Sequence, residues 1–93
     1  MSEVATLTRE MKVLNAYGIH ARPAALFVKT ANRFTAEINV EHKGMKVSAK
    51  SIMGLLTIEG HQGAVLTIDA CGEDAVEALD TLEELFVNKF NEE

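Results

Sequence analysis

The stretch AEINVEHKGMKVSA, residues 36–49, carries the clearest structural pattern in the chain. Apolar and polar side chains alternate strictly over Ala36–Glu41 and again over Met45–Ala49, as in β-strands with one buried face. His42–Gly44 lies between them and predicts a short hairpin loop, in which glycine is available for positive φ. The stretch therefore predicts an antiparallel hairpin that covers a core with one face only.

The segments on both sides of this hairpin predict further strands and helices in alternation. The expected strands are Met11–Ala16 and Ala64–Ala70, and the expected helices are Ala21–Arg33, Ser51 to about Ile58, and Gly72 to about Asn88. The order βαββαβα predicts an α+β fold, a two-layer open-faced sandwich in which three helices cover one face of a four-stranded antiparallel sheet. The first two strands are expected to lie parallel with another strand between them, as in a split βαβ unit.

The composition predicts one small cytoplasmic domain over residues 1–93. Of the 93 residues, 47% are hydrophobic, which is ample for a core, and the aromatic residues are few. No apolar run approaches the roughly 18 residues that span a bilayer, and the first 11 residues do not resemble a signal peptide, so we expect no membrane insertion. The one cysteine excludes an internal disulfide and fits a reducing compartment.

The charge distribution divides the chain into two halves. Residues 1–50 hold eight Lys/Arg and four Asp/Glu, whereas residues 51–93 hold one Lys and ten Asp/Glu. The net charge of −5 argues against general nucleic-acid binding. Two interpretations stay open: ordinary solvated faces, or a basic surface near the first helix that meets an acidic partner.

The segment Gly18–Ala25 places a histidine where a helix begins. A helix N-terminus offers unpaired amide groups and a partial positive charge, and both favour an anion. His20 would be a nitrogen nucleophile there, and Arg22 would supply donors for phosphate oxygens. The alternative is an N-cap or surface histidine without chemistry, and the residues alone do not decide between the two.

The segments Gly18–Ala25 and Ser48–Leu55, in this order, closely resemble the HPr family. These proteins are the histidine phosphocarriers of the bacterial phosphoenolpyruvate-dependent sugar phosphotransferase system, and the resemblance runs from about Met11 to Leu85. It implies that His20 accepts a phosphoryl group on Nδ1 from enzyme I and passes it to IIA domains of sugar permeases. It implies that Arg22 contacts phosphate and partner carboxylates. The protein would then be a carrier without a cofactor, not an enzyme.

The second of these segments resembles the regulatory serine site of HPr proteins. The resemblance implies that Ser51 is a substrate of an ATP-dependent HPr kinase/phosphorylase and, with it, a transcriptional regulator as a partner. A phosphate on a helix N-cap is favoured by the helix dipole, and its charge would weaken partners that dock beside it. The alternative is that Ser51 only caps the helix.

The predicted helix 51–58 has two apolar sides but room to bury one. We expect Leu55 and Ile58 in the core and the other side exposed as a docking patch. Its expected members, extended by the first helix and flanked by two lysines, are Ile52, Met53, Leu56, Ala25, Leu26, Lys29 and Lys50. The alternative is a crowded core that buries both sides.

The remaining candidates are weaker. His42 and His61 are expected in solvated loops, and neither pairs with Cys71 at metal-ligand spacing, so we predict no metal site. Tyr17 departs from the Asn or Thr often found before the glycine in HPr proteins, which puts the orientation of His20 in doubt.

Two other functions compete with the sugar carrier. One is a paralogue in a nitrogen-related phosphorelay, which Ala24–Ala25 and Lys50–Gly54 disfavour. The other is a non-catalytic regulatory binding module; such variants replace the histidine, whereas His20 is present. We expect a monomer, because the apolar patch is small.

Overall fold

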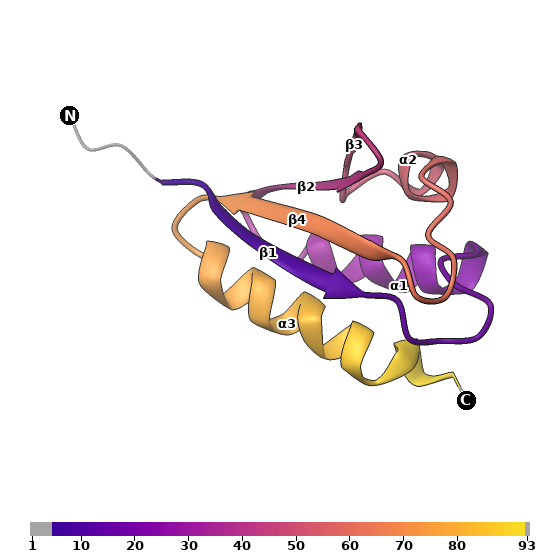
Figure 1. Ribbon diagram of the computed structural model, residues 1–93. Coiled ribbons are helices and arrows are strands. Elements are labelled where there is room, and N and C mark those ends of the chain that lie inside the picture. Colours follow the sequence, from indigo (N-terminus) through magenta and orange to yellow (C-terminus); the bar gives the residue numbers. More distant parts are fainter. Residues whose placement is uncertain (1–4, 93) are drawn as a thin grey trace.

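The computed structural model describes residues 5–92, and its elements follow the predicted βαββαβα order (Figure 1). The strands are β1 (Leu7–Lys12), β2 (Glu37–His42), β3 (Met45–Ser48) and β4 (Val65–Cys71). The helices are α1 (Ala21–Ala31), α2 (Ile52–Thr57) and α3 (Ala75–Val87), and a final 3₁₀ turn η1 spans Lys89–Asn91.

The sheet has the order β1-β4-β2-β3, and every neighbouring pair is antiparallel. Since β4 runs antiparallel to both β1 and β2, these two strands are parallel to each other with β4 between them. The split βαβ arrangement is confirmed. In Figure 1, α1 and α3 extend along one face of the sheet, and α2 lies beside β3 and contacts α1.

The core lies between the sheet and the helices. The alternation in the strands places Ile38 and Val40 of β2 opposite Ala70 and Ile68 of β4 on the buried face. The apolar stripes of the two long helices are buried too: Ala24, Phe27, Val28 and Ala31 from α1, and Ala75, Leu79, Leu82 and Phe86 from α3. The opposite face carries polar side chains, among them Asn39, whose amide donates to Asp69 at 3.2 Å. The open-faced sandwich is confirmed.

The β2–β3 hairpin closes through the two residues Lys43 and Gly44. Both are left-handed, with φ of 51° and 82°, as a tight turn matched to the twist of the strands requires. Strand β2 extends one residue further than predicted, and His42 is its last residue. The expectation of a solvated loop for His42 was wrong: its ring is half-buried, and Nδ1 donates to the carbonyl of Ile58 at 2.9 Å.

The first strand begins earlier than predicted, at Leu7 instead of Met11, and ends at Lys12 instead of Ala16. Arg9 explains why the start of β1 was missed, because it stands at a position that faces α3, where alternation leads one to expect an apolar residue. Its guanidinium binds Asp80 and Glu83 of α3, each at 2.8 Å. The two carboxylates, Asp80 first, raise the pKa of Arg9.

Asp74, directly before α3, connects that helix to the turn between α1 and β2. Its carboxylate does not cap its own helix but accepts the backbone amides of Thr35 at 2.8 Å and Ala36 at 2.9 Å. These hydrogen bonds, the one from Thr35 first, hold the pKa of Asp74 below its usual value. The contact fixes the end of the molecule opposite His20.

Candidate phosphoryl-acceptor site

The loop before α1 is held from two sides. Gly18 has φ of 67°, which favours glycine, and its amide donates to the carbonyl of Asn15 at 3.2 Å. The next amide, of Ile19, donates to the carbonyl of Gly60 at 2.8 Å, so the segment before β4 fastens the loop. A Cβ on Gly18 would lie 2.3 Å from that same Gly60 oxygen. The close approach of two backbones therefore requires glycine here.

His20 is the N-cap residue of α1 and has an extended backbone. Its side chain makes no capping hydrogen bond and is 41% exposed. Nε2 lies 3.0 Å from Oε2 of Glu92, while Nδ1 has no hydrogen bond to any residue in 5–92. The ring of Tyr17 stands edge-on to it, with the ring centroids 6.3 Å apart. The ring is accessible at the opening of the helix, and Nδ1 is available for chemistry.

The first turn of α1 provides donors beside this ring. The amides of Ala21 and Arg22 are at positions that have no intrahelical acceptor, and Pro23 has no amide hydrogen. The Arg22 side chain is exposed and forms no ion pair with any residue in 5–92. No acidic residue stands in this turn. The site can therefore receive an anion without first losing an internal partner.

Ser51 is confirmed as the N-cap of α2. Its Oγ accepts the amide of Gly54 at 3.0 Å, and its side chain is half-buried. Capping by a serine hydroxyl stabilises the start of a short helix. The regulatory interpretation is not tested by this geometry and stays a prediction.

The two sides of α2 divide as predicted. Leu55 and Ile58 are 2% and 4% exposed, whereas Met53 is 75% exposed. Ile52 and Leu56 are exposed as well, so the alternative of a crowded core is wrong. Exposure alone does not test whether partners dock there.

The flanking residues of the patch differ from one another. On α1, Ala25 and Lys29 are exposed, while Leu26 is half-buried against the core. Lys50 is half-buried, and its Nζ donates to the carbonyl of Phe34 at 2.9 Å. The ammonium group of Lys50 is therefore engaged just beyond the end of α1, and its expected role beside the patch stays a prediction.

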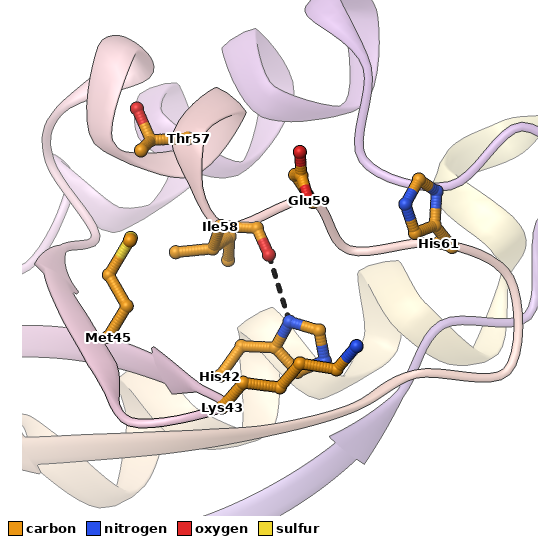
Figure 2. A pocket seen from close by; sticks show the side chains of 7 residues that line it. All are labelled: His42, Lys43, Met45, Thr57, Ile58, Glu59 and His61. Carbon is orange, nitrogen blue, oxygen red and sulfur yellow. Dashed lines mark hydrogen bonds between the residues drawn. The ribbon is translucent and has the colours of Figure 1, made fainter.

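A small pocket of about 160 Å³ lies elsewhere, between the β2–β3 turn and the end of α2 (Figure 2). His42 and Ile58, which are joined by the hydrogen bond described above, both line this pocket, whereas His20 and Arg22 do not. In Figure 2, His61 stands apart from His42 on the far side of the pocket. Within residues 5–92, no three His, Cys, Asp or Glu side chains are arranged to hold a metal ion. In the same range, no helix has the length and apolarity that crossing a bilayer requires.

Asn15 and Glu92 belong to the site but were missed in the sequence. Asn15 is completely buried, and its Nδ2 donates to the Gly18 carbonyl at 2.7 Å and to Glu92 Oε1 at 3.0 Å. A signal for it exists: Met11, Val13 and Asn15 are buried at every second position, and a polar residue in such a series is unusual. Glu92 gives no local signal, because it lies 72 residues from His20.

The site is a half-exposed histidine at a helix N-terminus of an open-faced α+β sandwich, an arrangement that can receive an anion. The family model for the PTS HPr component phosphorylation site matches residues 7–88. The chain belongs to the HPr family of phosphocarriers of the phosphotransferase system.

Individual relatives agree with this assignment. The phosphocarrier protein HPr of Treponema pallidum is 44% identical over 87 residues, which are 94% of this chain and 99% of that protein. The crystal structure of HPr from Bacillus anthracis superposes with a TM-score of 0.85 at 44% identity, over 88% of this chain and 98% of the other. Crh of Bacillus subtilis, 46% identical, superposes with a TM-score of 0.70 over 87% of this chain and 92% of its own, and is described as a dimer with a swapping domain.

Proposed function

We propose that this chain takes a phosphoryl group from phospho-enzyme I onto Nδ1 of His20 and passes it to IIA domains of sugar permeases. The observation that carries the proposal is the ring of His20, 41% exposed at the start of α1 with Nδ1 unoccupied by residues 5–92. The neighbouring amides and Arg22 would supply donors for the phosphate oxygens. In this proposal the chain is a carrier that passes on the group it receives and needs no cofactor. We further propose that the protein is cytoplasmic.

The exposed residues of α1 and α2 form the surface proposed for its partners. Met53, with Ile52 and Leu56, supplies the apolar centre, and methionine adapts to several partner shapes. Lys29 and Arg22 on α1 supply positive charge, and α1 contacts α2. Acidic partner surfaces would be attracted to this side of the molecule, and added salt would slow their association.

The test is phosphorylation with enzyme I, phosphoenolpyruvate and Mg²⁺. The adduct is expected on His20, labile in acid and stable in alkali, and absent in His20→Ala. Arg22→Ala is expected to slow transfer about tenfold to a hundredfold, as loss of a charge-assisted hydrogen bond worth about 1.5–3 kcal/mol predicts. Arg33→Ala, which removes an exposed charge beyond the other end of α1, is the control. Label that forms on His20→Ala contradicts the proposal.

The choice of acceptor distinguishes the two phosphorelays. Phosphorylated protein is offered separately to IIA domains of a sugar permease and of a nitrogen-related relay. Discharge to the sugar domain supports the proposal, and discharge only to the other supports the paralogue. Met53→Lys tests the docking surface against Val76→Lys, which adds the same charge at an exposed apolar site on α3. We expect the first to raise the KM for the partner about tenfold and the second to leave it unchanged.

Ser51 is the proposed second phosphorylation site, for an HPr kinase/phosphorylase and, through it, a transcriptional regulator. The supporting observation is its place at the start of α2, where a phosphate meets the positive end of the helix beside Met53. Incubation with kinase and ATP is expected to give an acid-stable phosphate that is lost in Ser51→Ala. Absence of this adduct leaves Ser51 as a cap.

The oligomeric state belongs to the proposal too. We propose a monomer with transient partners, although two relatives, an HPr of Thermoanaerobacter tengcongensis and Crh of Bacillus subtilis, are described as dimers. Light scattering of the purified protein decides between the two.

A further inference from the structure

The carboxylate of Glu92 connects two parts of the site that lie far from it in sequence. Its Oε2 is 3.0 Å from Nε2 of His20, and its Oε1 accepts Nδ2 of Asn15 at 3.0 Å. The Glu92 side chain is only 18% exposed. Figure 1 shows the C-terminal turn ending beside the loop between β1 and α1, where both partners lie. One side chain thus bridges the reactive histidine and a buried amide.

The turn before Glu92 has an unusual backbone. Lys89, Phe90 and Asn91 have φ of 54°, 53° and 63°, and none of them is glycine. Each left-handed residue of this kind is unfavourable by about 1–2 kcal/mol and persists only where surrounding contacts hold it. Phe90 provides such a contact, because its ring is 3% exposed and lies 5.0 Å from that of Phe86, centroid to centroid. The chain therefore bends back toward His20 against its local preference.

The contacts of Asn15 help to determine which atom carries the hydrogen between Glu92 and His20. Its Nδ2 donates to two groups that only accept, the Gly18 carbonyl and the Glu92 carboxylate, so the amide cannot be reversed. An ionised carboxylate also has no proton to give to His20. The hydrogen between Glu92 and His20 must therefore sit on Nε2. In a neutral imidazole the other nitrogen, Nδ1, then keeps its lone pair.

We propose that Glu92, oriented by Asn15, is a positioning residue that fixes the Nε2–H tautomer of His20 and so leaves Nδ1 as the nucleophile. The inference rests on the proposed function and states how the His20 ring is held in the tautomer that the transfer requires. In the transfer, the Nδ1 lone pair forms the bond to phosphorus, and the bond from phosphorus to the donor protein breaks with its electron pair leaving on the donor. The proton stays on Nε2, and the positive charge that develops on the ring faces the Glu92 carboxylate.

The tautomer itself is the first readout, because it is measurable without any phosphoryl donor. We would record two-bond ¹H–¹⁵N correlations of the His20 ring in alkaline buffer, where imidazole is neutral. Wild type is expected to show the Nε2–H form. Glu92→Gln is the sharp variant: the new amide oxygen faces Asn15, and its NH₂ group donates to Nε2, which favours the Nδ1–H form. Glu84→Gln removes the same charge at an exposed position on α3 and is expected to match wild type.

Transfer kinetics are the second readout. Glu92→Gln is expected to slow phosphorylation about tenfold to a hundredfold, by analogy with the loss of an orienting partner at metal-binding histidines. Glu92→Asp keeps the carboxylate and is expected to restore the Nε2–H form and part of the rate. An unchanged tautomer in Glu92→Gln overturns the inference, and so does a changed tautomer with an unchanged rate. If wild type is not phosphorylated at all, the proposed function fails, while the tautomer spectra still decide whether Glu92 orients the ring.

Discussion

Replacing Gly18 with alanine tests whether the backbone contact beneath the candidate site holds the His20 loop. The residue has φ of 67°, and a Cβ there would lie 2.3 Å from the Gly60 carbonyl oxygen and 3.0 Å from Cα of His61. Both obstacles are backbone atoms, so no side-chain rotation relieves the contact. The loop segments around Gly18 and Gly60 must move apart, and the hydrogen bond from the Ile19 amide to the Gly60 carbonyl, 2.8 Å long, is expected to break.

The expected loss in the free energy of unfolding is the sum of separate costs. A left-handed alanine is unfavourable by about 1 kcal/mol, and a lost hydrogen bond costs about 1 kcal/mol. Displacement of the packed segment adds to both, so we expect Gly18→Ala to lower the free energy of unfolding by about 2–4 kcal/mol. Gly44→Ala is the matched control, because Gly44 has φ of 82° but a Cβ there meets nothing within 4 Å. It should cost about 1 kcal/mol, the conformational part alone.

Urea unfolding of wild type and both variants gives the comparison. With an m-value of about 1 kcal/mol per molar urea, Gly18→Ala should unfold about 1–3 M earlier than Gly44→Ala. Its phosphorylation by enzyme I should also be slower at temperatures where it is folded, because the loop carries His20. Equal midpoints for the two variants would refute the argument, since the contact with Gly60 would then contribute nothing.

Three further predictions use unfolding as well. Asp74 has a lowered pKa, so the stability it contributes is present above its unfolded-state pKa and is lost as pH falls through its folded-state pKa. Asp74→Asn is therefore expected to flatten the decline of the melting temperature on the acid side. An unchanged slope contradicts this. Ser51→Ala removes the cap on the Gly54 amide and should cost about 1 kcal/mol in urea; no loss would mean that the cap is dispensable. Leu55→Ala, in the core, should cost about 2–5 kcal/mol, while the exposed Leu56→Ala should cost less than about 1 kcal/mol, and equal losses would contradict the assignment of the two faces of α2.

Much of the fold was predictable because its elements carry their own periodic patterns. The alternation of Ala36–Glu41 and the stripe of α3 are local signals, and both appear as buried faces. The pattern failed at Arg9, where a charged side chain faces α3 and is satisfied by carboxylates more than 70 residues away. It failed again at His42, whose partner, the Ile58 carbonyl, belongs to another element.

The candidate site divides in the same way. His20, Arg22 and the start of α1 form one contiguous motif, so their place at a helix N-terminus could be predicted. Asn15 and Glu92, which contact the Gly18 carbonyl and the His20 ring, could not be identified, because a buried amide and a distant carboxylate become part of the site only when the fold brings them together. Local sequence thus predicts which group reacts, and tertiary structure determines how that group is oriented.

The topology explains why Glu92 reaches His20. β4 leaves the His20 end of the sheet, where Val13 donates to Ala64 at 2.8 Å, and its seven residues cover about 23 Å to the opposite end. There Asp74 turns the chain into α3, whose 13 residues cover about 20 Å in return. Strand and helix are nearly equal in length, so the helix ends level with the loop from which the strand began. A deletion of one helical turn from α3, about 5 Å, would leave Glu92 out of reach of His20 while preserving the sheet. The length of α3 is therefore a property of the site as much as of the fold.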